Sequence, residues 1–160
     1  MRQESVGIGR VLLAAVLLMI VSQVVHTVGA FSAMGYYQDP EYVSVWSKLM
    51  MPEPGPPPPE FMWTSLAFAF ITGLLFALVY NAVRGGVSGE SPAMKGLMFG
   101  WLVFVVAGIP AALAMYLTIN VPPGLILMWT GQALLIYLVG GLITGAVVRP
   151  GAAPTAEAAS

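Results

Sequence analysis

Four long apolar runs constrain this chain more than any other feature of its sequence. They cover residues 11–34, 61–83, 96–119 and 125–148, and none of them contains Asp, Glu, Lys or Arg. A helix that crosses the hydrocarbon core needs about 20 mostly apolar residues, and it satisfies its own backbone hydrogen bonds there. The sequence therefore predicts an all-α integral membrane protein, with a single four-helix membrane domain over residues 1–150. Residues 151–160 lack apolar periodicity, which predicts a disordered tail.

Composition supports the same environment and excludes several kinds of site. The chain is 58% hydrophobic and 8% charged, whereas a soluble domain carries about 25% charged residues. Cysteine is absent and His26 is the single histidine, so a thiolate or a multi-histidine metal site cannot come from one chain. The basic residues form no cluster of the kind that nucleic acid requires. We therefore expect a lipid bilayer around the protein, no cofactor and no nucleic acid.

The basic residues predict the orientation. Five of them fall on one side of the four runs and one on the other; they are Arg2, Arg10, Arg84, Lys95 and Arg149 against Lys48. Cytoplasmic segments carry an excess of Lys and Arg, so both termini are predicted to be cytoplasmic, in a plasma or inner membrane. An alternative is a signal peptide cleaved after Ala30. We expect the first run to be retained, because it continues through Phe31, Ala33 and Met34.

The segment between the first two runs has its own pattern. Asp39 can cap a helix that begins at Pro40, and apolar residues then follow at helical spacing. We expect a short amphipathic helix over residues 40–51 on the outer membrane surface, followed by a stiff, extended spacer over residues 52–59. The helix could cap a pore, dock a partner or serve only as an interfacial anchor.

The tripeptide Met-Trp-Thr occurs twice, at residues 62–64 and 128–130. One interpretation is a weak internal duplication, in which spans one plus two and spans three plus four are parallel copies of a helical hairpin. The other is that tryptophan marks the level of the lipid headgroups. We favour the second interpretation, because the first and third spans align poorly.

Small residues predict where helices approach each other closely in lipid. The third span also contains Pro110, which removes a helix hydrogen bond and predicts a kink. The predicted packing positions are Ser65, Ala69, Gly73 and Ala77 in the second span, Gly96 and Gly100 in the third, and Gly141 and Gly145 in the fourth.

Polar residues inside the spans form the candidate site. Polar groups in hydrocarbon are costly unless paired, so they tend to face the interior of a bundle. Five such residues fall at similar depth toward the predicted outer face; they are Gln23, His26, Thr64, Thr130 and Gln132. They could form a binding site or relay for a small polar substrate, or a hydrogen-bond network that fixes the register of the helices.

The sequence favours no enzymatic chemistry. No carboxylate lies inside a span, and no phosphate-binding glycine loop precedes a helix. A single histidine could ligate haem only with a methionine, and the methionines lack the close repeats of a copper site. We expect a non-catalytic accessory or scaffold subunit of a membrane assembly, bound to other subunits or to itself. The alternative is a small transporter or channel for a neutral or weakly polar solute, with a homo-oligomeric form.

Overall fold

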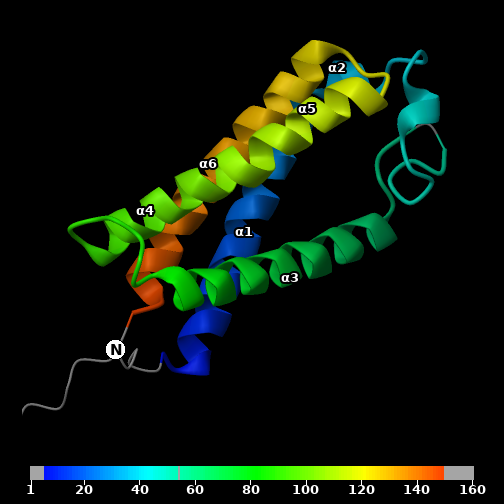
Figure 1. Ribbon diagram of the computed structural model, residues 1–160. Helices are drawn as coiled ribbons and strands as arrows, with labels where there is room; N and C mark the ends of the chain where they lie inside the picture. Colours follow the sequence, from blue (N-terminus) through cyan, green and yellow to red (C-terminus); the bar gives the residue numbers. More distant parts are fainter. Residues whose placement is uncertain (1–5, 54, 150–160) are drawn as a thin grey trace, which may run out of the picture.

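The computed structural model describes residues 6–53 and 55–149, and every regular element in these ranges is helical. As predicted, the described residues contain four helices that are long and apolar enough to cross a membrane. The tail predicted at 151–160 lies outside the described residues. In chain order the elements are α1 (Ile8–Ser32), α2 (Met34–Tyr37), the 3₁₀ turn η1 (Val43–Val45), α3 (Pro59–Val83), α4 (Pro92–Val103), the π-helical turn η2 (Phe104–Gly108), α5 (Ile109–Thr118) and α6 (Pro123–Val147) (Figure 1).

Prolines explain why three of the spans begin earlier than predicted. Pro59, Pro92 and Pro123 each stand in the first turn of a helix, where the fixed φ of proline suits the helix and its missing N–H is not needed. In α4 the Ser91 hydroxyl also accepts a hydrogen bond from the Met94 N–H at 3.2 Å, a side-chain N-cap. The predicted spans began after Glu60, after Lys95 and after the Pro-Pro-Gly turn at residues 122–124, and therefore omitted these polar and proline-containing first turns.

The helices form a bundle from which one member diverges. The rod of α4, η2 and α5 lies along α6, α1 packs on the other side of α6, and α3 crosses α1 (Figure 1). The first half of α3 then extends away from the other helices. We call the end with Arg10, Arg84, Lys95 and Arg149 the basic end, and the end with α2 and residues 38–53 and 55–58 the loop end.

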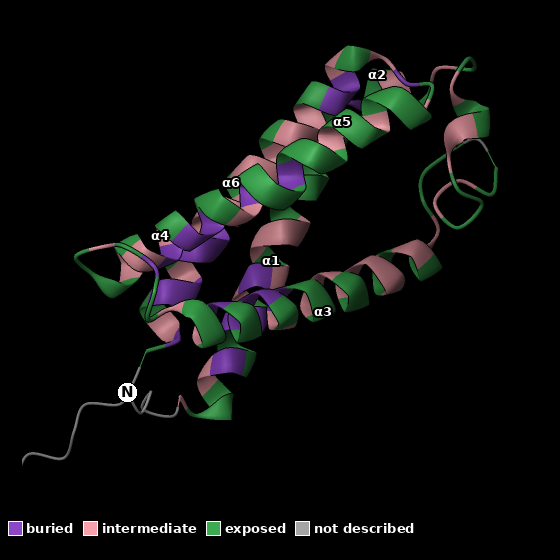
Figure 2. Ribbon diagram, in the orientation of Figure 1, coloured by how far each residue is buried: buried purple, intermediate pink, exposed green. Residues whose placement is uncertain are grey.

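The buried core has two parts, one near each end of the bundle (Figure 2). Near the basic end the ring of Phe76 lies 4.9 Å from that of Phe99 and is stacked on Tyr137 with centroids 6.1 Å apart. Near the loop end Leu125 is fully buried. The cluster at the basic end comprises Val11, Ala14, Leu18, Phe76, Ala77, Tyr80, Val87, Phe99 and Val148, and the cluster at the loop end comprises Ala33, Val121, Leu125 and Ile126.

Glycines lie where α4 and α6 touch backbone to backbone. A Cβ added to Gly96 would overlap the carbonyl oxygen of Gly141, and one added to Gly100 would overlap the carbonyl oxygen of Tyr137. A Cβ on Gly145 would likewise overlap the carbonyl oxygen of Pro92. The α4–α6 interface therefore leaves no room for larger residues at these positions.

Glycine also lies at the crossing of α1 and α3. A Cβ on Gly73 would lie 2.7 Å from the carbonyl oxygen of Ala15, and Ala77, one turn later, is fully buried. Ser65 and Ala69 continue the same row toward the loop end but are only half-buried. The small-residue row of α3 is therefore covered by α1 over part of its length.

The third span accommodates Pro110 through a π-helical turn. The N–H of Ile109 donates to the carbonyl oxygen of Phe104, one residue further back than in an α-helix. The wider turn gives room to a proline ring that would otherwise collide with the carbonyl of Val106. The sequence predicts a kink at this position. Figure 1 instead shows α4, η2 and α5 as one continuous, gently curved rod.

The amphipathic helix predicted over residues 40–51 is not formed. The Asp39 carboxylate does accept a hydrogen bond from the Glu41 N–H at 3.0 Å, but the segment contains only the short η1 and turns. Trp46 has an extended backbone, with φ −74° and ψ 143°, and its ring packs against Tyr37 and Trp129 with centroids 5.0 Å and 6.2 Å away. Aromatic packing onto the bundle thus replaces the local helical pattern.

Candidate functional site

Two polar side chains lie on one face of α1, between α3 and α6. Gln23 and His26 are three residues apart and therefore share a helix face. The Gln23 amide N–H donates to the sulfur of Met62 in α3 at 3.8 Å. The Nδ1–H of His26 donates to the amide oxygen of Gln132 in α6 at 3.1 Å. We call Gln23, His26 and Gln132 the polar site.

Gly29 makes room for this site, a role that was not predicted from the sequence. Gly29 is buried one turn after His26 on the same helix, and a Cβ at this position would overlap the side-chain amide of Gln132. Any larger residue would therefore push Gln132 away from His26. The signal in the sequence was a glycine at helical spacing from the single histidine, on the face that was expected to turn inward.

The hydrogen bond determines which nitrogen of His26 can act on another molecule. Because the Gln132 oxygen accepts, Nδ1 carries a proton, and in a neutral ring Nε2 is then the acceptor. His26 is exposed in this chain. Its Nε2 can therefore accept a hydrogen bond from a hydroxyl or amide group of a neighbouring helix or solute.

The two predicted threonines do not join the polar site. The Thr64 hydroxyl donates to the carbonyl oxygen of Glu60 at 2.8 Å, and the Thr130 hydroxyl donates to that of Ile126 at 2.7 Å. Such bonds one turn back satisfy the hydroxyl within its own helix. The structure thus joins His26 to Gln132, places Gln23 against α3 and leaves both threonines outside the site.

The two Met-Trp-Thr tripeptides have different surroundings. The indole N–H of Trp129 donates to the Tyr37 hydroxyl at 3.0 Å, and the ring contacts Trp46. Trp63, by contrast, is 71% exposed. The second tripeptide holds the segment around Trp46 against the bundle, whereas the first presents its indole to the surroundings.

Carboxylates surround a tyrosine in the same outer segment. Partial desolvation, followed by the nearby carboxylates of Glu41 and Asp39, raises the pKa of the Tyr42 hydroxyl above its ordinary value of 10.0. This hydroxyl therefore stays protonated at neutral pH and contributes no charge to the loop end.

A groove of about 450 Å³ runs between α1 and α6 beside Gln132. Its walls are mainly apolar and include Val24, Val28, Met128 and Leu135. Such walls suit an acyl chain, an apolar side chain or a weakly polar solute, and they offer little to a hydrated ion.

No residue in the first half of α3 is buried, and the same is true of α5 (Figure 2). The buried residues of α3 are Gly73, Phe76, Ala77 and Tyr80, which all belong to its second half. In the first half Phe68 is 65% exposed. The divergence of α3 thus leaves an extended helix face beside the polar site.

Comparison with known proteins assigns no family to the chain: no family model, no curated protein and no solved structure matches it. Within residues 6–53 and 55–149, His, Asp and Glu side chains form no group of three or more that could hold a metal ion.

Proposed function

We propose that this chain is a non-catalytic subunit of a membrane assembly, and that a transmembrane helix of another subunit lies beside the first half of α3. The proposal rests on one observation: α1 covers only part of the small-residue row of α3. Gly73 and Ala77 are buried in the crossing with α1, whereas Ser65 and Ala69 continue the row half-buried. Helices in lipid associate through such rows because backbones can approach closely there.

The polar site supports a helix as the occupant. His26 bonds Gln132 of α6 through Nδ1, and Gln23 on the same face of α1 bonds Met62 of α3. The His26 side chain is nevertheless exposed. An uncovered imidazole in hydrocarbon is costly, and Nε2 of neutral His26 can accept a hydrogen bond when Nδ1 donates to Gln132. The partner helix would therefore carry small residues toward Ser65 and Ala69, and a hydroxyl or amide group toward His26.

The orientation belongs to the same proposal. The basic end lies in the cytoplasm, because Arg10, Arg84, Lys95 and Arg149 gather there. The loop end then faces outward, and its segment around Trp46, packed on the bundle, provides a second contact surface for the partner. The glycines of α4 and α6 serve packing within the chain, whereas the small-residue row of α3 is only half-buried toward the loop end.

Native mass spectrometry of the C-terminally tagged protein, extracted gently from its own host, tests the proposal. We expect a foreign subunit at fixed stoichiometry. Ala69→Leu should release this subunit, and Ala114→Leu, the same change at an exposed position of α5, should retain it. Spectra that contain only the monomer would contradict the proposal.

A second candidate is a transporter for a neutral or weakly polar solute. It is favoured by the apolar groove of about 450 Å³ that reaches Gln132. If this function is correct, the native mass spectra should show a homo-oligomer without a foreign subunit. The rate of solute flux should also be lower in Gln132→Leu than in the unmodified protein. The absence of Asp, Glu, Lys and Arg from the apolar runs weighs against coupling to ions or protons.

A further inference from the structure

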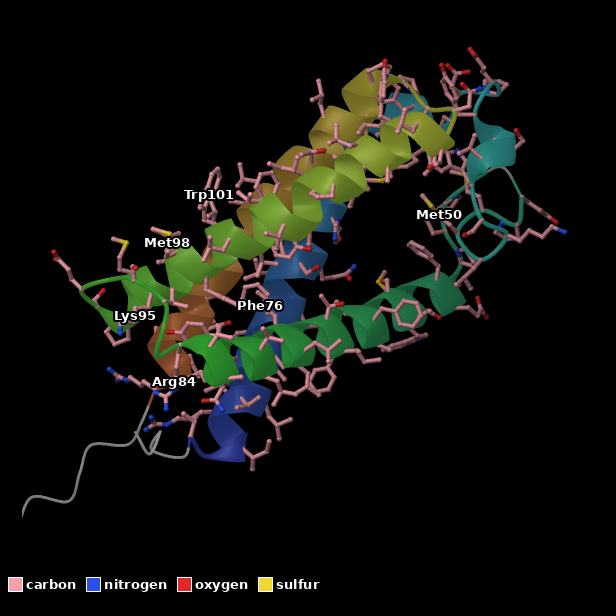
Figure 3. The ribbon with its side chains drawn as sticks, viewed as in Figure 1. Met50, Phe76, Arg84, Lys95, Met98 and Trp101 are labelled. Atoms are coloured by element: carbon pink, nitrogen blue, oxygen red, sulfur yellow. The ribbon has the colours of Figure 1, made fainter. Side chains whose placement is uncertain are left out.

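A cavity of about 420 Å³ lies at the basic end, away from the polar site. Its lining brings together residues that are far apart in the sequence, from the end of α3, the start of α4 and the end of α6. The polar members are Tyr80, Arg84, Glu90, Ser91, Lys95 and Arg149. Figure 3 shows Arg84 and Lys95 at this end of the bundle. The lining thus carries three basic side chains and one carboxylate.

The backbone around the cavity is held by several contacts. The Tyr80 hydroxyl donates to the carbonyl oxygen of Pro92 at 3.4 Å, which ties α3 to the first turn of α4. Gly89 has a φ of +151°, and a Cβ there would lie 2.6 Å from the backbone nitrogen of Lys95. The turn after α3 therefore packs tightly on the backbone of α4. The guanidinium of Arg10 donates to the carbonyl oxygen of Arg149 and fixes the end of α6. These contacts hold the three segments that line the cavity next to one another.

The charges of the lining suit an anion at the level of the lipid headgroups. The N-terminus of α4 adds the partial positive charge of its helix dipole to those of Arg84, Lys95 and Arg149. Arginine binds phosphate oxygens through two N–H groups at once. Because the cavity lies where spanning helices begin and end, a phosphate group there can belong to a lipid whose chains run along the helices.

We propose that this cavity binds the phosphate group of an anionic lipid headgroup. The carboxylate of Glu90 determines which anionic headgroups fit the cavity. It repels additional phosphates and accepts hydrogen bonds from hydroxyl groups. The site therefore favours a single phosphodiester that carries a hydroxyl-bearing headgroup, such as phosphatidylglycerol. This proposal stands independently of the proposed subunit function.

Binding to the full chain in a mild non-ionic detergent tests it. Short-chain phosphatidylglycerol, short-chain phosphatidylcholine and inorganic phosphate are titrated separately, and binding is followed by native mass spectrometry and thermal shift. We expect phosphatidylglycerol to bind more tightly than the other two. Lys95→Gln should weaken its binding about fivefold, as the loss of one basic residue near a membrane surface does. Lys48→Gln, the same change at the loop end, is the matched control and should have no effect.

Three outcomes would overturn the proposal. The first is equal binding of phosphatidylglycerol and phosphatidylcholine, and the second is unchanged binding in Lys95→Gln. The third is inorganic phosphate that binds as tightly as the lipid, which would make the cavity a site for free phosphate. Arg84→Gln removes a second positive charge from the cavity and should also weaken the binding of phosphatidylglycerol. If this variant does not fold, the binding measured for Lys95→Gln alone tests the proposal.

Discussion

At the scale of the residue, one hydrogen bond determines the geometry of the polar site. His26 and Gln132 were expected to meet because both lie at a similar depth in antiparallel spans, and their side chains are 3.1 Å apart. The role of Gly29 could not be predicted in the same way, because it depends on how closely α1 and α6 approach each other. The threonines were predicted to join the site, and their hydroxyls instead donate to the carbonyl oxygens one turn back in their own helices, a bond that is open to a helical threonine at any position.

A double-mutant cycle measures the His26–Gln132 bond. We expect His26→Leu and Gln132→Leu to be coupled by about 0.6 kcal/mol in the free energy of unfolding, the average for interhelical hydrogen bonds in membranes. Unfolding in mixed micelles with increasing SDS provides the measurement. His26→Leu combined with Thr130→Val is the control cycle and should show no coupling. A coupling of zero in the first cycle would show that the bond does not stabilise the fold.

Two glycines of α6 and α4 allow a matched test of close packing. Gly96→Ala should destabilise the chain by about 1–3 kcal/mol, the usual cost of overpacking, because the new methyl group would overlap the Gly141 carbonyl. Gly131→Ala is the control, since nothing lies within 4 Å of a Cβ there. It should be neutral or slightly stabilising, because alanine favours helix. The same SDS unfolding assay measures both, and equal effects would contradict the role of Gly96.

At the scale of the element, the sequence predicts spans well and short surface helices poorly. Long apolar runs specify a spanning helix by themselves, and the observed bounds differ from prediction mainly by proline-containing first turns. The helix expected over residues 40–51 fails because its apolar residues find partners far away in the sequence. Trp46 packs on Trp129 and Tyr37, and a local periodicity carries no information about such contacts.

The two tryptophans of the repeated tripeptide provide a test at this scale. Trp129→Leu should free the segment around Trp46 and speed its cleavage by a protease added at the loop end by at least several-fold, because it removes the bond to Tyr37 and the ring contact. Trp63→Leu, the same change at an exposed position, should leave the cleavage rate unchanged. Limited proteolysis followed by mass spectrometry compares the two. Equal rates in both variants would mean that the aromatic contacts do not hold the segment.

At the scale of the whole molecule, the divergence of α3 is the feature that sequence reasoning could not supply. Hydropathy gives the number and length of the spans, but it contains no information on how they cross. Lipid provides no hydrophobic drive for helices to close on each other, so a span can diverge with its apolar face exposed. The row from Ser65 to Ala77 was identified from the sequence, yet only the structure separates the part that is buried against α1 from the part that is only half-buried.

Site-specific photo-crosslinking in the membranes of the native host tests the central claim most directly. A photoreactive amino acid replaces Ala69, on the half-buried part of the small-residue row of α3, and in a separate variant it replaces Leu127, which is 71% exposed on α6. The account predicts one discrete adduct with a foreign membrane protein at Ala69 and none at Leu127. Adducts with lipid alone at both positions would contradict it.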